Sequence, residues 1–394
     1  MRIVGTFSGI GGLELPFRSH GHETAALCDW WAPSQTVLSS RFGGTELFGD
    51  IADLADDSAF PADVDLLTAG FPCTDLSQAG GTAGINGEET GQVRHVFRIL
   101  ERNPSISYLV LENVRNMLVL DKGRAMAFLV DQLEQLGFRW AYRLVDSRFS
   151  GVPQRRHRVI FVASRGTNAI DPRRVLFADN TPEPDHENGE HLRRDAFGFY
   201  WTEGLRGLGW AVDAVPPLKG GSTVGIPSPP CVWIPDARPG RRLAQPTVEH
   251  AEILQGFEPG WTKAADTGKA NSPRWKLVGN AVTVGVTDWL ADSLTANLSA
   301  ERNFALDIDG EPIGAKWPNA AWGVPGAPAV AVEASTFPVQ ETYKHLLDVA
   351  PAEEMQPLST RAAAGFLSRL RRGSLRRPAA FEQDVADHAA AGSG

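Results

Sequence analysis

The sequence predicts an α/β protein with a mixed, mostly parallel sheet, followed by a smaller, irregular β-rich part. From residue 1 to about 165, short β-rich apolar runs alternate with longer segments of helical periodicity, which is typical of βαβ units. From 166 to about 265, Gly, Pro and Trp are scattered among short β-like pieces without a sustained period. The length of 394 residues suits one large domain and a smaller one.

Six strands are expected in the first part, and helices lie between them. The strands are residues 2–7, 23–28, 64–69, 107–111, 139–146 and 158–163. Helical spacing of apolar residues appears at 94–100 and 124–136. Gly137 then stands where the end of a helix favours a residue that tolerates a positive φ.

The remaining sequence predicts how the chain is divided. A helical stretch at 280–298 returns to the first part, and a Pro- and Ala-rich link leads to an amphipathic segment at 362–370. The end, 389–394, is expected to be disordered. The expected parts are a catalytic and cofactor-binding domain at 1–165, a target-recognition domain at 166–275, a returning helix at 276–300 and a partly helical C-terminal extension at 301–394.

Composition narrows the class of protein. Hydrophobic residues make up 42% of the chain, and no segment approaches the roughly 18 uninterrupted apolar residues that span a bilayer. The N-terminus begins as a core strand and lacks the features of a signal peptide. We therefore expect a soluble cytoplasmic protein. Cys28, Cys73 and Cys231 are widely separated with no CxxC pair, so neither a disulfide framework nor a metal site is expected.

Charge argues against a protein that coats nucleic acid non-specifically. The formal net charge is −9, whereas such binding relies on broad basic surfaces that neutralise phosphates. Basic residues nevertheless cluster locally in the second half, at 155–158, 193–194, 238–242 and 369–377. A local basic cleft is therefore compatible with the composition.

A glycine-rich turn follows the first expected strand, with the sequence FSGIGGL at 7–13. Glycines let the backbone approach a ligand closely, and Asp29 at the end of the next strand could bind ribose hydroxyls. This pattern indicates a nucleoside site. Glu14 takes the place of the third glycine of the dinucleotide-binding signature, and no phosphate-binding Gly-Lys-Ser/Thr follows. A purely structural turn and a nicotinamide site remain alternatives.

Cys73 lies in a Gly/Pro-shaped loop directly after the expected strand at 64–69. A cysteine at the carboxyl end of a parallel strand points toward the ligand crevice of an α/β fold, and a thiolate is a strong nucleophile. A buried structural cysteine is the alternative. For Cys28 and Cys231 the structural interpretation is the only one.

Two further clusters favour a functional interpretation of Cys73, and the first of them also lies at the crevice edge. Glu112 ends an apolar strand, where a carboxyl group could act as an acid or could simply be solvated. Residues 151–158 place three arginines and a histidine before the last expected strand. Strand alternation would send Arg156 and Arg158 to one face of the strand. Arg155 and His157 would then point to the other face. A solvated basic edge is the alternative.

Together and in this order, these clusters closely resemble the cytosine-C5 DNA methyltransferase family over most of residues 1–300. The matching motifs are Phe-x-Gly-x-Gly-Gly at 7–12, Asp29-Trp30, Asp50-Ile51, Pro72-Cys73, Glu112-Asn113-Val114, Gln154-x-Arg156-x-Arg158 and Gly279-Asn280-Ala281-Val282. Residues 242–257 look like the family's ninth motif, and 166–240 correspond to its target-recognition region. The resemblance implies a Rossmann-like S-adenosylmethionine-dependent methyltransferase core with a small irregular β-rich recognition domain.

The resemblance also implies the reaction. The Cys73 thiolate would add to C6 of a flipped cytosine in a specific double-stranded DNA sequence, and C5 would take the methyl group of S-adenosyl-L-methionine, leaving S-adenosyl-L-homocysteine. Glu112 would hydrogen-bond N3 and the amino group of the base. Arg156 and Arg158 would bind near the base O2 and the cysteine loop.

The cofactor site follows from the same motifs. Phe7 would lie against the adenine, Asp29 on the ribose, Trp30 on the ring, Asp50 and Ile51 at the adenine edge, and Asn280 with Val282 at the methionine end. The full set implied is Phe7, Ser8, Gly9, Gly11, Gly12, Leu13, Asp29, Trp30, Asp50, Ile51, Pro72, Asn280 and Val282.

The sequence departs from the family at Thr74 and Leu76, where glutamine and phenylalanine are common, so the DNA contacts of this loop are left unassigned. Competing hypotheses are an RNA cytosine methyltransferase, including the tRNA-directed branch of this fold, a catalytically silent DNA-binding protein, and a nicotinamide dehydrogenase. The expected setting is restriction–modification or another bacterial antiphage system, as a monomer with double-stranded DNA and defence components as partners. The arginine-rich segment after 300 could grip DNA, bind such a partner or be a solvated face.

Overall fold

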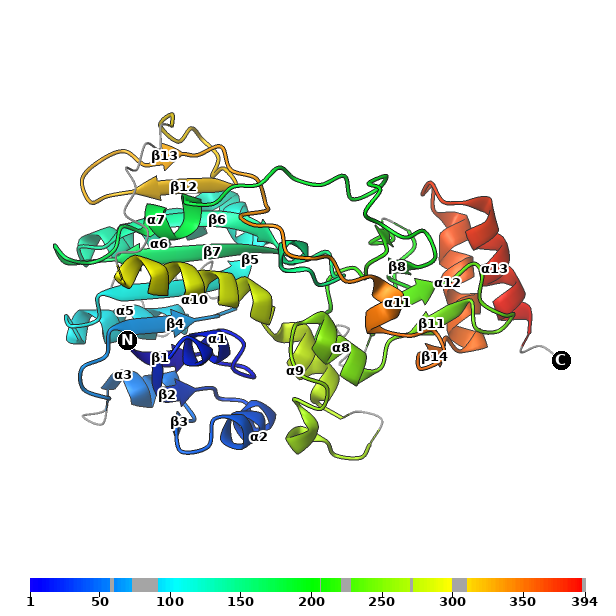
Figure 1. Cartoon of the computed structure of the whole chain (residues 1–394), viewed down its shortest axis with the longest axis horizontal. Helices are drawn as coiled ribbons and strands as arrows, with labels where there is room; N and C mark the ends of the chain where they lie inside the picture. Colours follow the sequence, from blue (N-terminus) through cyan, green and yellow to red (C-terminus); the bar gives the residue numbers. More distant parts are fainter. Residues whose placement is uncertain are drawn as a thin grey trace. The chain divides into compact units, whose positions relative to one another are not determined.

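The computed structural model describes residues 1–56, 60–72, 91–205, 207–220, 228–269, 272–299 and 310–391. The chain folds into two compact units (Figure 1). The first unit contains Met1–Phe149, His157–Glu183 and Val282–Gln340. The second contains Ser150–Arg156, Pro184–Ala281 and Glu341–Gly394. The chain therefore enters the second unit three times, and each unit is assembled from segments that are distant in sequence.

A nine-stranded mixed sheet forms the centre of the first unit, in the order β13-β12-β6-β7-β5-β4-β1-β2-β3. Strands β3, β2, β1, β4 and β5 are parallel neighbours, whereas β7 and β12 run antiparallel to theirs. The strands are β1 Arg2–Thr6, β2 Glu23–Cys28, β3 Glu46–Phe48, β4 Leu66–Ala69, β5 Tyr108–Val114, β6 Arg139–Asp146, β7 His157–Ser164, β12 Ala320–Gly323 and β13 Val330–Ala331.

Helices cover both faces of this sheet, and two apolar clusters lie beneath them (Figure 1). Buried side chains of α3, α5 and α6 form one cluster, and those of α1, α7 and α10 form the other. Because both faces are covered, the central strands consist almost wholly of buried residues. The helices are α1 Glu14–Ser19, α2 Ala32–Arg41, α3 Ile51–Asp56, α5 Val93–Arg102, α6 Arg124–Gln135, α7 Pro172–Phe177 and α10 Val284–Leu298, with 3-10 turns η1 Arg115–Leu118, η2 Leu120–Gly123 and η3 Ser147–Ser150.

The second unit is built on a five-stranded antiparallel sheet in the order β14-β11-β10-β8-β9. Its strands are only two or three residues long, which agrees with the broken periodicity of this part of the sequence. They are β8 Phe197–Phe199, β9 Ala211–Val212, β10 Cys231–Trp233, β11 Leu243–Gln245 and β14 Gln356–Pro357. The helices are α8 Val248–Leu254, η4 Lys263–Ala265, α9 Arg274–Asn280, α11 Leu346–Val349, α12 Thr360–Arg372 and α13 Ala379–Ala390.

The expected α/β core with a mixed, mostly parallel sheet is confirmed, and all six expected strands are present. The expected division of the chain differs from the two units. Residues 310–340 add β12 and β13 to the sheet of the first unit, while 341–391 complete the second unit, so the described residues of the expected extension are divided between the two units. Helix α13 continues to Ala390, into the segment expected to be disordered.

The returning helix also begins later than expected. A helix ends at Asn280 and the next starts at Val284, because the intervening residues adopt extended backbone angles at Ala281 and Thr283. Within the described ranges, none of the helices has the length and apolar character needed to traverse a bilayer.

Candidate functional site

The turn after β1 is shaped by unusual backbone angles. Phe7, Gly9 and Gly11 have φ values of 54°, 56° and 84°. A Cβ on Gly11 would lie 2.2 Å from the ring of Phe42, so this position needs glycine for space as well as for conformation. The Ser8 amide donates to the Cys28 carbonyl at 3.0 Å, which ties the turn to the end of β2. The expected glycine turn therefore has the required geometry.

The Asp29 side chain links the glycine turn after β1 to the backbone that follows β2. Its Oδ2 accepts a hydrogen bond from the Gly9 amide at 2.8 Å, and its Oδ1 accepts one from the Trp31 amide at 2.9 Å. Burial raises the pKa of Asp29 above its ordinary value, opposed by these amide donors. The carboxylate is thereby held in one orientation at the carboxyl end of β2.

A pocket of about 370 Å³ opens at this edge of the sheet. Aromatic rings and two carboxylates are its main features, and Trp30 leaves 76% of its surface exposed. The Asp50 carboxylate also caps the following helix by accepting from the Ala52 amide at 2.8 Å. An apolar cleft with a few placed polar groups suits a nucleoside. The lining residues are Phe7, Cys28, Asp29, Trp30, Asp50, Ile51, Pro72 and Gln92.

Six of the expected cofactor residues line this pocket, namely Phe7, Asp29, Trp30, Asp50, Ile51 and Pro72. Ser8 and Leu13 are buried behind the turn. Cys28 and Gln92 were not expected in the lining. Burial raises the pKa of the Cys28 thiol to about 12, so this sulfur is unsuited to nucleophilic chemistry. Gln92 lies next to α5, and no motif in the sequence distinguishes it.

Cys73 lies outside the described residues, and the chain that leads to it is held by a side chain of β5. Asn113 Nδ2 donates to the Phe71 carbonyl at 3.0 Å, two residues before the cysteine. The Asn113 Oδ1 accepts from the Val114 amide at 2.9 Å, which fixes the amide group. The sequence placed Asn113 in a motif but indicated no role for its side chain. The structure shows that it anchors the start of the cysteine loop.

Glu112 and Arg158 form a close ion pair across neighbouring strands. Arg158 Nε lies 2.6 Å from Glu112 Oε1, and the side chains are only 12% and 11% exposed. Antiparallel pairing of β5 with β7 places Val114 opposite Arg158, which brings the guanidinium to the carboxylate. Glu112 and Arg158, two of the three residues expected at the base, therefore lie together. Glu112 is on β5, the neighbour of β4, and the chain leads from β4 to Pro72.

Arg156 is placed differently from the expectation. Strand β7 begins at His157, so the prediction that Arg156 and Arg158 share a face of one strand is wrong. Arg156 belongs to the second unit and is 1% exposed. Its Nη1 donates to the Leu218 carbonyl at 2.9 Å, and its Nη2 donates to the Ala281 carbonyl at 2.8 Å. The guanidinium therefore holds two backbone carbonyls of the second unit, and a role for Arg156 near the base stays a prediction.

Asn280 and Val282 fall in different units. Asn280 lies in the second, where a Cβ on Gly220 would approach its Oδ1 to 2.3 Å. Val282 lies in the first, inside the cluster beneath α10. The pocket lining of the first unit includes neither residue, and their place at the methionine end of the donor stays a prediction. Within the second unit, Gln154 Nε2 donates to the Leu254 carbonyl and its Oε1 accepts from the Leu218 amide, so the Gln154 motif position is also structural.

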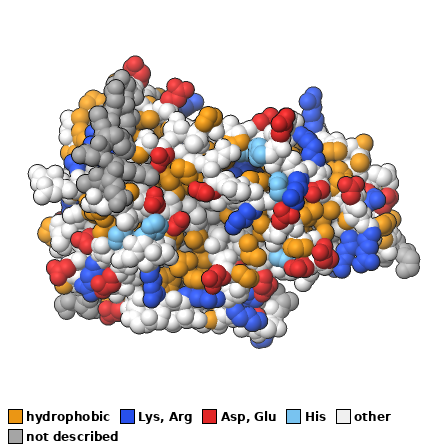
Figure 2. Space-filling model, in the orientation of Figure 1, with side chains coloured by type: hydrophobic (Ala, Val, Ile, Leu, Met, Phe, Trp, Pro, Cys, Tyr) orange, Lys and Arg blue, Asp and Glu red, His pale blue; other side chains and the backbone are white. Residues whose placement is uncertain are grey.

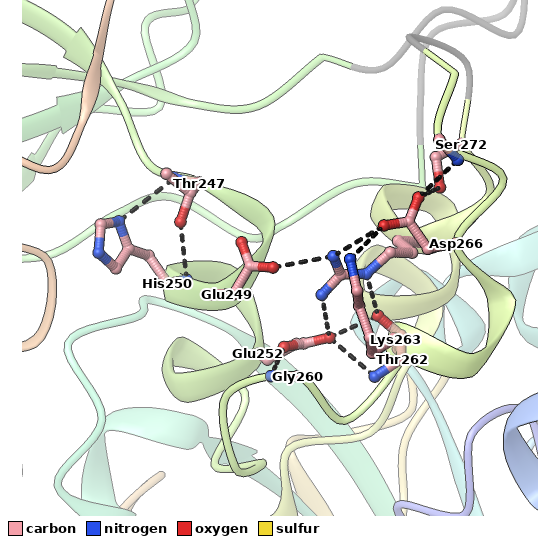
Figure 3. A network of polar contacts seen from close by, with 11 residues as sticks. Thr247, Glu249, His250, Glu252, Gly260, Thr262, Lys263, Asp266 and Ser272 are labelled. Atoms are coloured by element: carbon pink, nitrogen blue, oxygen red, sulfur yellow. Dashed lines mark hydrogen bonds and ion pairs between the residues drawn. The ribbon is translucent and has the colours of Figure 1, made fainter. Parts of the chain in front are cut away.

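The segment expected to be the ninth motif contributes α8 to a charge network in the second unit, with Glu252 and Arg274 buried at its centre (Figure 3). Glu252 is fully buried and accepts hydrogen bonds from the Gly260 and Thr262 amides at 2.5 and 2.8 Å. Arg274 lies 3.1 Å from Glu252 and 2.8 Å from Glu249. A hydrogen bond from Lys263 lowers the pKa of Asp266 to about 2. This network holds α8, α9 and the loop between them in one arrangement.

Glu14 is a buried acid that sequence reasoning treated only as a missing glycine. It is fully buried behind the glycine turn, and its Oε1 accepts from the Thr68 hydroxyl at 2.7 Å. Burial raises its pKa to about 7. An acidic residue directly after the apolar end of a glycine-rich turn is the signal that could have marked it. In the described part of the chain, no group of three His, Cys, Asp or Glu side chains could hold a metal ion.

Comparison with known proteins identifies related sequences and folds. Residues 1–199 match the family model described as C-5 cytosine-specific DNA methylase. The chain is 42% identical over 380 residues to the Type II methyltransferase M2.BsuMI of Bacillus subtilis (strain 168), covering 94% of each chain. It is 31% identical over 181 residues to the Type II methyltransferase M.NgoBI of Neisseria gonorrhoeae, covering 46% of this chain and 52% of that one.

The fold is similar to that of a solved S. pombe Dnmt2 methyltransferase, with a TM-score of 0.56. The match covers 76% of this chain and 99% of the other, at 17% sequence identity. At this identity the similarity concerns the fold alone.

Proposed function

Because the chain belongs to the C-5 cytosine-specific DNA methylase family, we propose that it methylates C5 of a flipped cytosine in a specific double-stranded DNA sequence, with S-adenosylmethionine as donor. The observation that carries this proposal is that the pocket and a buried ion pair lie at the same edge of the sheet in the first unit. The pocket beside Asp29 and the Glu112–Arg158 pair lie at the carboxyl ends of neighbouring strands, and Pro72, next to Cys73, lines the pocket.

The pocket residues fit S-adenosylmethionine chemically. The Asp29 carboxylate, oriented by the Gly9 and Trp31 amides, suits ribose hydroxyls, and the exposed Trp30 ring offers an aromatic face to adenine. The glycine turn lets backbone groups approach the ligand. When bound, the donor supplies an electrophilic methyl group on a sulfonium sulfur.

Cys73 would act as the nucleophile. Its thiolate forms a bond to C6, the electrons of the C5–C6 double bond move to C5, and negative charge on the ring is compensated at N3. C5 would then form a bond to the methyl group as the methyl–sulfonium bond breaks, leaving the neutral thioether S-adenosylhomocysteine. Transfer of the C5 proton to a base restores the double bond as the C6–sulfur bond breaks and the thiolate leaves. The target carbon is inaccessible in a stacked duplex, so the base must be flipped.

Glu112 and Arg158 would prepare this step together. The carboxyl group of Glu112 can hydrogen-bond N3 and the amino group of cytosine, and the Arg158 guanidinium can reach O2 while keeping Glu112 in place. Asn113 would position the cysteine loop through the Phe71 carbonyl. In this scheme Arg156 does not bind the base itself. It would stabilise the backbone of the second unit, because its guanidinium donates to the Leu218 and Ala281 carbonyls.

A methyl-transfer assay tests the function. Purified protein is incubated with labelled S-adenosylmethionine and either duplex DNA or tRNA, beside a Cys73→Ala control. We expect label in duplex DNA and none with the control. Label entering only tRNA, or label unaffected by the substitution, would refute the proposal. A 5-fluorocytosine duplex should trap a covalent adduct on the unsubstituted protein only, because fluorine cannot leave as the C5 proton does.

The related Type II methyltransferases suggest the biological setting. We propose that the protein acts in the cytoplasm as a monomer within a restriction–modification or other antiphage system, whose components are its further partners. Base-resolution sequencing of methylated DNA from cells that express the protein or its Cys73→Ala variant tests this. A single modified sequence present only with the unsubstituted protein is expected, and an unchanged methylation pattern would contradict it.

A further inference from the structure

An unusual concentration of positive charge lies near the C-terminus. Residues 360–378 contain six arginines and no aspartate or glutamate, in a chain whose formal net charge is −9. The arginines are Arg361, Arg369, Arg371, Arg372, Arg376 and Arg377. Arginine is the side chain best suited to phosphate, since its planar guanidinium can donate two parallel hydrogen bonds.

The helix that carries these residues is firmly docked in the second unit. Ala363, Phe366 and Leu370 of α12 are fully buried, and the Phe366 ring lies 5.2 Å from the ring of Phe199 on β8. Helix α13 is fixed as well, because Asp384 accepts from Trp233 Nε1 at 2.8 Å. The arginines are therefore presented by an ordered platform, which reduces the entropy lost when a ligand binds.

Three of the six arginines are used within the fold. Arg369 donates to the carbonyls of Trp201 and Glu203, at 2.8 and 3.0 Å. Arg371 and Arg377 share the carboxylate of Glu382, at 3.1 and 2.7 Å. One carboxylate thus serves two guanidinium groups, and the local charge stays positive.

The other three, Arg361, Arg372 and Arg376, are exposed and have no acidic partner among the residues that the structure describes. We call them the arginine face. In Figure 2, Lys and Arg side chains gather at the right-hand end of the visible surface, the region where Figure 1 draws α12 and α13.

Helix stability alone does not explain these positions. Cations in the last turn of α12 are favoured by the helix dipole, which accounts for Arg372. Arg361 lies in the first turn, where the same dipole disfavours a positive charge. An exposed cation placed against the dipole, beside further cations without acidic partners, fits a surface that meets a polyanion.

We propose that the arginine face binds phosphates of duplex DNA, so that the C-terminal helices form part of the DNA interface. This inference rests on the proposed function, which supplies duplex DNA as the partner. Duplex DNA suits this face because its charge is complementary to that of the arginines. It carries one negative charge per roughly 1.7 Å of its axis. Contacts of this kind contribute affinity and orientation rather than sequence discrimination.

The test compares DNA binding by the full-length protein and its Arg361→Gln/Arg372→Gln/Arg376→Gln variant. Fluorescence anisotropy with a labelled duplex of mixed sequence, in salt from about 50 to about 200 mM, gives affinity and its salt dependence. Each lost phosphate contact should reduce the slope of log K against log salt by about 0.9 in magnitude, so three should reduce it by about 3. We expect a fall in affinity of about tenfold or more at low salt.

A matched control removes the same charge elsewhere. The Arg18→Gln/Arg41→Gln/Arg98→Gln variant changes three arginines on helices of the first unit, where Arg18 and Arg41 lie in the last turns of α1 and α2. It should keep the slope of the unsubstituted protein. Both variants should retain their melting temperature and their S-adenosylmethionine affinity by calorimetry, which confirms that they are folded.

Two results would overturn the inference. One is an unchanged affinity and slope in the arginine-face variant. The other is an equal loss in both variants, which would make net charge rather than the face responsible. Because anisotropy measures binding without methyl transfer, either result leaves the methylation assay unaffected. Conversely, failure of methyl transfer to duplex DNA with an intact, salt-dependent contribution of the arginine face would refute the proposed activity alone.

Discussion

The carboxyl group of Glu14 occupies the space that a side chain at Gly5 would need. A Cβ added at position 5 would lie 2.4 Å from Glu14 Oε1 and 2.7 Å from the Ser8 hydroxyl oxygen. Glycine in the middle of β1 therefore makes room for a buried acid directly beneath the glycine turn. The stability of the glycine turn, and of the sheet edge that carries the pocket, should depend on the contact between Gly5 and Glu14.

Substitution of Gly5 by alanine should destabilise the protein. The methyl group would overlap the Glu14 carboxyl group and the Ser8 hydroxyl, and overpacking of a core costs about 1 to 3 kcal/mol. Urea unfolding measures the loss. The Gly5→Ala/Glu14→Ala double variant should recover part of it, because the smaller side chain vacates the contested space. Additive losses in the double-mutant cycle would contradict the steric relationship.

Glu14 should also make stability depend on pH. Its pKa rises from 4.5 to about 7 on folding, because burial disfavours the charged form. Below pH 4.5 both folded and unfolded chains hold the proton, and the full stability is present. As pH rises through 7 the unfolded chain has already released its proton, so stability falls by about 3 kcal/mol.

The Glu14→Gln variant keeps the shape and the Thr68 contact but cannot titrate. Unfolding free energies of the two proteins, measured at several pH values from about 4.5 to about 8, should therefore diverge, with the unsubstituted protein losing more. Titrating groups that do not interact with Glu14 contribute equally to both curves. Parallel curves would show that Glu14 does not titrate in this range.

Much of the first unit was predictable because its signals are local. A buried strand appears in the sequence as a short apolar run. The carboxyl ends of parallel strands lie at one edge of the sheet, so Asp29 and Pro72 were correctly expected near the glycine turn. Strand β12 was missed because its four residues, AAWG, follow a Pro- and Ala-rich link and pair with β6, about 180 positions earlier in the sequence.

Long-range partners account for the remaining differences. The period of a strand predicts a face for Arg156, but carbonyls at positions 218 and 281 decide where its guanidinium lies. Likewise, nothing near position 14 in the sequence shows that Gly5 and Thr68 enclose its carboxyl group. Such contacts arise only once the sheet has brought distant segments together.

Glu112→Gln should slow methyl transfer while leaving the pocket intact. The amide keeps the size of the side chain but removes the charge that pairs with Arg158 and the acid that serves the base. Loss of such a group lowers the rate by about 100-fold or more. Single-turnover assays measure this, and calorimetry should show unchanged S-adenosylmethionine affinity. The exposed Glu46→Gln change on β3 is a control that should retain full activity. A rate within a factor of about three of the unsubstituted protein would contradict the role of Glu112.

Arg156 and Arg158 should fail in different ways when each is replaced by methionine, which keeps volume but donates no hydrogen bond. Arg156→Met leaves buried carbonyls at Leu218 and Ala281 without their donor, and should lower the free energy of unfolding by at least about 2 kcal/mol. Arg158→Met removes one partner of an ion pair near the reacting edge, and should reduce the methylation rate far more than stability. Urea unfolding together with single-turnover rates separates the two effects. If Arg156→Met kept full stability and lost its rate, while Arg158→Met did the reverse, the assignment of the two arginines would have to be exchanged.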